Sequence, residues 1–150
     1  MTGDYDRAMD EHRQDLLALL LPVTRELRRL EEAAAATRGL TMWQYAILSV
    51  AGGRRDLNQA EAADLLGYSK NRIVADLDHL ETMGLLTRRR GADRRANALD
   101  VTAEGRRATA EVQAEIHRRE DELLGPVSPA TRRAFAAGLR ALNERLRAPR

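Results

Sequence analysis

Two short helical segments, with an arginine-rich hairpin directly after them, constrain this sequence more than any other feature. Helical patterns run over residues 58–66 and 69–83, and Gly67 permits a tight turn between them. A basic hairpin follows over residues 86–101. This order of elements is the layout of a winged helix-turn-helix, which places one helix in the DNA major groove and a cationic loop beside it.

Local signals mark where these helices begin. Asn58 with Glu61 three residues later is a capping-box arrangement, and Ser69 is expected to cap the second helix. The apolar residues that recur at helical spacing on the inner face of the second helix are Ile73, Leu77 and Leu80.

Long amphipathic helices are predicted at both ends of the chain. The apolar positions of the first helix are Leu16, Leu20, Val23, Leu27 and Leu30. Pro22 lies inside this pattern, and we expect a kink or a break there. The corresponding positions near the C-terminus are Phe135, Leu139, Leu142 and Leu146.

These patterns predict one domain over residues 1–150 with a mainly α fold, α+β only through its small wing. The winged helix-turn-helix occupies residues 41–105, and residues 1–37 and 106–150 form dimerisation helices. A wing domain of roughly 60 residues is too small to cover both long apolar stripes, so a second copy of the chain is expected to bury them. The alternative is that the termini fold back as an intramolecular bundle. A two-fold dimer would match a palindromic DNA operator.

Charge is gathered where this motif needs it. The net charge is only +2, from 25 basic and 23 acidic residues, but residues 69–107 hold nine basic against six acidic residues.

The chain has no cysteine, which excludes thiol redox sensing and thiolate metal sites. It also shows no signal-peptide pattern and no apolar run long enough for a membrane span, so a cytoplasmic protein without a membrane partner is expected.

The start of the second helix holds the candidate contacts to base edges and phosphates. Residues early in a recognition helix reach the major groove, where arginine pairs with guanine and asparagine with adenine. The candidates are Ser69, Lys70, Asn71 and Arg72. The alternative is that these are solvated surface residues at a helix start.

The hairpin supplies a second set of DNA-contact candidates. Alternation along a strand favours Arg88 and Arg90 as phosphate contacts. Arg94 and Arg95 stand at the tip, where a narrow minor groove attracts arginine, and Asp93 could orient one of them. The alternative is a charged hairpin that protects a sheet edge.

Several motifs together resemble the MarR (multiple antibiotic resistance regulator) family of bacterial repressors. They are Gly39-Leu40-Thr41, Gln44-Tyr45, Leu48, Ser69, Ile73, Leu77-Asp78, Leu80-Glu81, Gly84-Leu85, Asp93-Arg94-Arg95 and residues 101–105. The resemblance implies a homodimer that binds palindromic double-stranded DNA and is released by a small, often phenolic, ligand. Ala75 and Asp76 depart from the family, where many relatives carry a basic and an apolar residue.

The resemblance also implies a ligand crevice between the dimerisation helices and the wing domain. The candidates to line it are His12, Leu16, Met42, Trp43 and Tyr45. An aromatic pair with a few polar groups would suit a flat aromatic anion or phenol. The alternative is that Tyr45 packs in the core and Trp43 in a helix junction.

Other functions find little support in the sequence. It has no phosphate-binding glycine loop, metalloprotease helix or nucleophile elbow, so no enzyme, catalytic residue or cofactor is predicted. The three histidines are not paired at helical spacing, and no metal site is predicted. The alternatives to a ligand-released repressor are a DNA-binding regulator without a ligand and a helical protein-interaction module.

Overall fold

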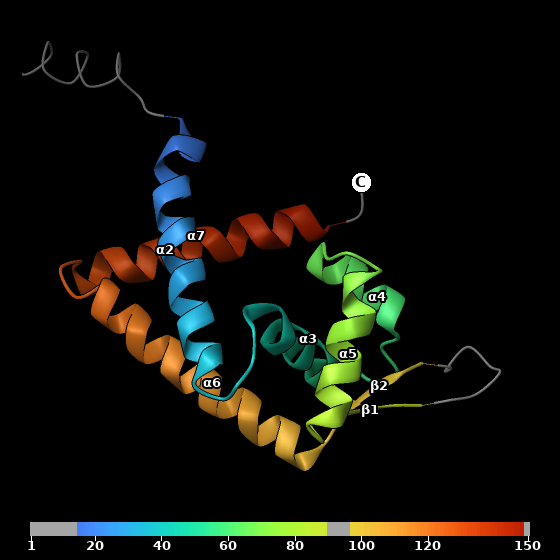
Figure 1. Cartoon of the computed structure of the whole chain (residues 1–150). Coiled ribbons are helices and arrows are strands. Elements are labelled where there is room, and N and C mark those ends of the chain that lie inside the picture. The colour runs from blue at the N-terminus through green and yellow to red at the C-terminus, as the bar shows by residue number, and fades with distance from the viewer. Residues whose placement is uncertain (1–14, 90–96, 149–150) are drawn as a thin grey trace, which may run out of the picture.

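The computed structural model describes residues 15–89 and 97–148 and shows a mainly helical chain with one small sheet. The elements in order are α2 (Leu16–Ala36), α3 (Met42–Gly53), α4 (Gln59–Leu66), α5 (Arg72–Thr82), β1 (Leu86–Arg88), β2 (Leu99–Val101), α6 (Ala103–Leu123) and α7 (Pro129–Arg147) (Figure 1). The two strands pair antiparallel, with Leu86 opposite Val101. The predicted fold class is confirmed.

Side-chain caps set the starts of four helices. Thr41 with Gln44 and Asn58 with Glu61 each form a complete capping box, at the starts of α3 and α4. Two further caps are the hydroxyls of Thr102 and Ser128, at α6 and α7. Each cap satisfies backbone donors that would otherwise lack a partner.

Helix α2 runs through Pro22 without interruption, so the break that the sequence allowed at this position does not occur. Pro22 is exposed, as is Ala18 one turn before it. The carbonyl that loses its intrahelical donor can therefore bond to water, which lowers the cost of the proline.

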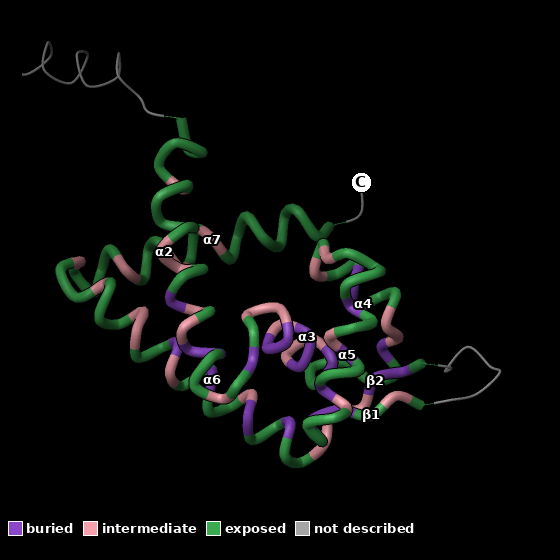
Figure 2. The backbone as a smooth tube through the Cα atoms, in the orientation of Figure 1, coloured by how far each residue is buried: buried purple, intermediate pink, exposed green. Residues whose placement is uncertain are grey.

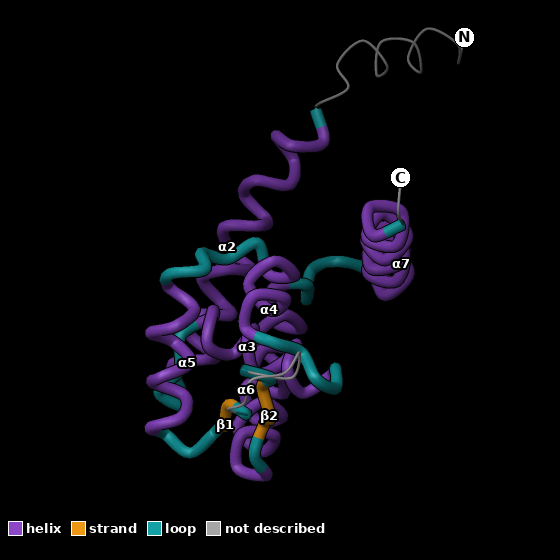
Figure 3. Tube along the Cα trace, turned by 90° about the vertical axis from the view of Figure 1, so that its right-hand side faces the viewer, coloured by secondary structure: helices purple, strands orange, loops and turns teal. Residues whose placement is uncertain are grey.

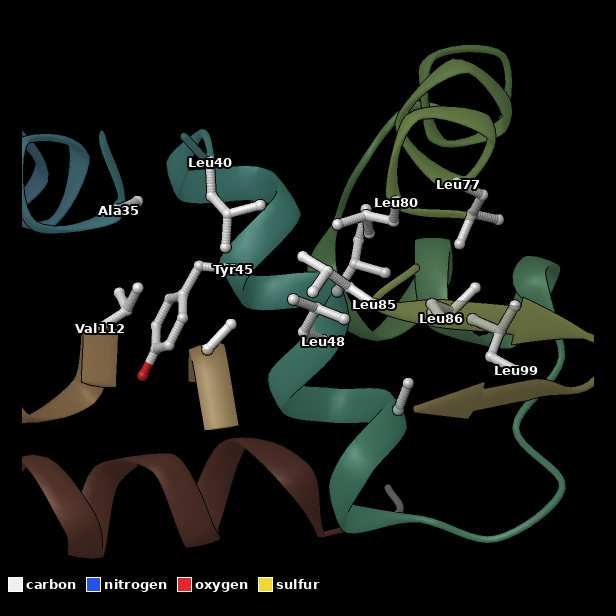
Figure 4. Close-up of a cluster of buried hydrophobic side chains, with 14 of the residues drawn as sticks. Ala35, Leu40, Tyr45, Leu48, Leu77, Leu80, Leu85, Leu86, Leu99 and Val112 are labelled. Carbon is white, nitrogen blue, oxygen red and sulfur yellow. The ribbon is translucent and has the colours of Figure 1, made fainter. Parts of the chain in front are cut away.

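The core lies around α3, which contacts α2, α4, α5, α6 and β2. Figure 4 shows Tyr45 beside Val112 of α6, and the leucines of α5 and the sheet on the other side of α3. Among its fully buried side chains are Ile47, Leu48, Ile73, Leu77, Leu80, Leu86, Leu99 and Val112. The buried segments concentrate in the lower half of the view in Figure 2. This core holds α5 and the sheet in one unit.

The outer parts of the terminal helices lie outside this core. Helix α7 has no buried residue, and Figure 3 shows it end-on, clear of the other helices. Large apolar side chains are exposed on the terminal helices at Leu16, Leu17, Leu19, Leu21, Val23, Leu123, Phe135, Leu142 and Leu146. In the described residues, therefore, the terminal helices do not fold back into an intramolecular bundle that covers both apolar stripes. None of the described helices combines the length and apolar composition needed to cross a membrane.

Candidate nucleic-acid interface

The turn before α5 and the first residue of the helix carry four polar side chains. The Ser69 hydroxyl accepts the backbone N–H groups of Asn71 and Arg72 at 3.3 and 3.4 Å, and Ile73 N–H donates to the Ser69 carbonyl at 3.0 Å. Residues 70–71 form a turn. The α-helix therefore begins at Arg72, three residues later than the sequence pattern predicted. Ser69, Lys70, Asn71 and Arg72 are all exposed.

The buried inner face of α5 determines which face of the helix is exposed to solvent. Ile73, Leu77 and Leu80 are at most 1% exposed and pack into the core, as predicted.

Lys70 makes only a loose ion pair with Asp64 at 3.7 Å, and both side chains are more than two-thirds exposed. Because such a pair is worth little, Lys70 is free to exchange it for another anion.

The Asp76 side chain of α5 is only partly exposed and bonds to groups of the protein itself. Its carboxylate accepts the Tyr68 hydroxyl at 2.6 Å and the Gln44 side-chain amide at 3.1 Å. Burial and the bond to Asp76 raise the pKa of Tyr68 to about 12. The Tyr68 ring also stacks on Trp43, with ring centroids 4.3 Å apart. Sequence reasoning missed Tyr68 and Gln44, although the unusual acid at Asp76 was a signal.

Arg88 ties the first wing strand to α5. Its backbone N–H donates to Glu81 at 2.9 Å, and its guanidinium bonds to Glu81 at 3.1 Å and to Asp78. Hydrogen bonds to Glu81 and Asp78 raise the pKa of Arg88 despite its burial. Only 13% of the side chain is exposed. This inward placement differs from the outward phosphate contact that strand alternation predicted for Arg88.

Arg89 ties the second wing strand to the loop before α4. Its guanidinium donates to both carboxylate oxygens of Asp100 at 2.9 Å and to Asp56 at 2.7 Å. The hydrogen bonds to Asp100, and next to Asp56, raise the pKa of Arg89, and the same pairing lowers the pKa of Asp100. These bonds hold the base of the wing against the helix-turn-helix.

Comparison with known proteins identifies this arrangement. A family model described as MarR family matches residues 38–96, which hold α3, α4, α5 and β1. A protein of Thauera aromatica named as a transcriptional regulatory protein for the hcr operon is 27% identical over 116 residues, 77% of this chain and 70% of that protein. Residues 38–96 of this chain therefore match the MarR family.

Solved structures of MarR-family proteins share the fold. A Mycobacterium tuberculosis member in complex with DNA has a TM-score of 0.75 at 23% identity, over 87% of this chain and 98% of that chain. The same protein with p-aminosalicylic acid has a TM-score of 0.74 at 25% identity, over 87% and 99%. The transcriptional repressor CouR has a TM-score of 0.69 at 27% identity, over 87% and 93%. CouR from Rhodococcus jostii has also been solved bound to p-coumaroyl-CoA.

Five of the predicted MarR-type contact residues lie outside the described residues. They are His12 of the ligand set and Arg90, Asp93, Arg94 and Arg95 of the wing. Their roles remain predictions from the sequence.

The other ligand candidates are not gathered at one point of the chain. Leu16 begins α2, about 30 Å along that helix from the end that leads to α3. Tyr45 is 8% exposed and packs in the core, whereas Met42 and Trp43 are partly exposed at the start of α3. Among the described candidates, only Met42 and Trp43 are both adjacent in sequence and partly exposed, and the ligand role of each residue remains a prediction.

Proposed function

We propose that this chain is a homodimeric repressor of the MarR family that binds a palindromic operator and is released by a small aromatic ligand. The observation that carries the proposal is the start of α5, where Lys70, Asn71 and Arg72 are exposed and the opposite face of the helix is buried. This geometry suits insertion into a major groove. A DNA-binding role also makes the cytoplasm, where bacterial DNA lies, the expected location.

The homodimer is proposed from the apolar faces of α2 and α7. Leu142 and Leu146 are 56% and 80% exposed, and Leu16 and Leu17 are 60% and 66% exposed. Exposed apolar area of this extent on two helices marks an interface between proteins. A second copy of the chain would cover it and would set two recognition helices about one DNA turn apart.

The ligand is proposed from the relatives together with the candidate crevice. The Mycobacterium tuberculosis relative has been solved with p-aminosalicylic acid and with salicylic acid, and CouR with p-coumaroyl-CoA. The proposed place for a small aromatic acid is beside Trp43 and Met42, and the roles of His12 and Leu16 stay predictions from the sequence. The release is a population shift between a conformation that binds DNA and one that does not. A ligand can lower the DNA affinity only by the factor by which it binds the second conformation more tightly than the first.

The direct test compares two arginine variants on DNA. A fluorescence-anisotropy titration measures the affinity of the parent, Arg72→Ala and Arg95→Ala for the promoter duplex and for single-base variants of it. Arg72→Ala should relax the preference at one base position, at a cost of about 1–3 kcal/mol, whereas Arg95→Ala should weaken binding to every duplex. Equal affinity of both variants and the parent would contradict the assigned contacts.

The ligand is tested by adding salicylate to the preformed complex. Release of the duplex at a salicylate concentration that leaves the protein folded would support an aromatic effector. If neither salicylate nor p-coumaroyl-CoA changes the affinity, the ligand-independent regulator becomes the better description of this chain.

A further inference from the structure

Asp76 stands on the recognition helix, but its carboxylate is used inside the protein. One oxygen accepts the Tyr68 hydroxyl at 2.6 Å, and the other accepts the Gln44 side-chain amide at 3.1 Å. Tyr68 precedes Ser69 in the turn that leads into α5, and Gln44 belongs to α3. One carboxylate therefore joins the recognition helix to the turn before it and to the central helix of the core.

The orientation of the Gln44 amide is determined by a second bond. Its oxygen accepts the backbone N–H of Thr41 at 3.1 Å, which completes the capping box of α3. The amide nitrogen must therefore face Asp76. Gln44 is only 6% exposed, so its N–H would lose its partner if the carboxylate were removed.

The position of Tyr68 is determined from two sides. Its ring stacks on Trp43 with planes 18° apart, and its hydroxyl bonds to Asp76. The phenol, whose pKa is raised to about 12, is protonated at neutral pH and donates this bond. Trp43, Tyr68 and Asp76 thus hold the turn from which the next residues, Ser69 and Lys70, project.

We propose that Asp76 is a positioning residue for DNA recognition, which holds the Ser69–Arg72 segment in the orientation that the operator requires. A carboxylate on this helix would repel phosphate if it served no other purpose, whereas a recognition site needs its side chains held to within about 0.5 Å. The inference rests on the proposed function, because it concerns the same interface.

The first test removes one hydroxyl and no charge. Tyr68→Phe keeps the ring for stacking on Trp43 but cannot donate to Asp76. We expect its affinity for the promoter duplex to fall by about three- to tenfold, with little change on scrambled DNA, because binding to scrambled DNA depends on charge. Equal promoter affinity of Tyr68→Phe and the parent would overturn the proposal.

The second test holds the charge constant. Asp76→Asn and Asp76→Ala both lose one negative charge, but the asparagine oxygen can still accept the Tyr68 hydroxyl. The ratio of promoter to scrambled affinity should therefore be several-fold higher for Asp76→Asn than for Asp76→Ala. An equal ratio in the two variants would show that Asp76 acts through its charge alone and would overturn the proposal.

A double-mutant cycle separates positioning from general loss of stability. If Tyr68 and Asp76 act through their shared bond, Tyr68→Phe should cost no further promoter affinity in the Asp76→Ala background. Additive losses would overturn the proposal. Emission from Trp43, the only tryptophan in the chain, reports whether the stack survives in each folded variant. If the parent itself shows no preference for the promoter, the proposed function fails, which is a distinguishable outcome.

Discussion

At the scale of single residues, Gly105 shows how closely α6 packs against the recognition unit. A Cβ added at this position would overlap the backbone carbonyl oxygen of Leu85 and lie 2.8 Å from a methyl group of Val101. Leu85 directly precedes β1, and Val101 is the last residue of β2. The absence of a side chain at Gly105 therefore allows the wing and α6 to meet.

Gly105→Ala should destabilise the protein by more than about 2 kcal/mol, because the Leu85 backbone cannot move aside without disturbing the sheet. Urea unfolding measures the change. Gly53→Ala is the matched control, since a Cβ there meets nothing within 4 Å. It should shift the free energy of unfolding by no more than about 1 kcal/mol. Similar effects of the two variants would contradict the packing described for Gly105.

Glu31 is a second single residue with a measurable consequence. Burial, and then the negative charges of Glu120 and Glu32, raise the pKa of its carboxyl group. A carboxyl whose pKa is raised by folding favours the folded state below its unfolded pKa, and this contribution is lost as the pH rises through the folded pKa. At neutral pH the ionised Glu31 therefore opposes folding.

Glu31→Gln should stabilise the protein at pH 7, by on the order of 0.5 kcal/mol for this partly exposed site. The gain should shrink as the pH falls to about 4, where most of the Glu31 carboxyl is protonated in both the folded and the unfolded state. Thermal melts at pH 7 and pH 4 measure it. Glu26→Gln is the control on the same helix, because a hydrogen bond from Arg29 lowers the pKa of Glu26 and the substitution should bring no gain. A gain for Glu31→Gln that is the same at both pH values would contradict the account.

At the scale of elements, what could be predicted from the sequence depended on whether the signal was local. The capping box at Asn58 and the inner face of α5 depend on residues three or four apart, and both are confirmed. The partners of Arg88 and Asp76 could not be predicted. Strand alternation and helical periodicity give the face of a residue, but not the side chain that meets it from another element. The ion pairs of Arg88 depend on the packing of β1 against α5, which the sequence pattern does not specify.

Arg88→Met should loosen the tie between β1 and α5 without affecting a phosphate contact. Because it leaves Glu81 and Asp78 without that guanidinium, we expect a loss of about 1–2 kcal/mol in urea unfolding. The slope of DNA affinity against salt concentration should stay at the parent value, since the guanidinium faces α5. The comparison is Arg95→Ala, whose slope should fall by about one. A similar fall for Arg88→Met would mean that Arg88 contacts phosphate.

At the scale of the whole molecule, the described chain leaves apolar side chains of its terminal helices uncovered. The core of α3, α4, α5 and the sheet is closed, whereas α7 buries no residue and keeps Phe135, Leu142 and Leu146 exposed. The sequence predicted this face from its periodicity. It could not show which partner covers it, because an apolar stripe fits another helix of the same chain and a second copy equally well.

Sedimentation velocity should show a dimer of about twice 16.8 kDa at micromolar concentration. Replacing Leu142 and Leu146 together by glutamate should weaken this association by more than about tenfold, because charges would be buried without partners. Leu65→Glu is the control, since Leu65 is an exposed leucine of α4, away from the terminal helices. A monomeric parent, or an unchanged dimer in the double variant, would contradict the proposed interface.

Whether this chain recognises DNA through α5 and the wing is tested first by a fluorescence-anisotropy titration. The parent protein, shown by mass spectrometry to carry no bound ligand, is titrated into the promoter duplex next to its gene and into a scrambled duplex. Promoter affinity should be about a thousandfold above that for the scrambled duplex, and should fall by roughly 100-fold or more between about 50 and 200 mM salt. Equal affinity for the two duplexes would contradict sequence-specific recognition through α5 and the wing.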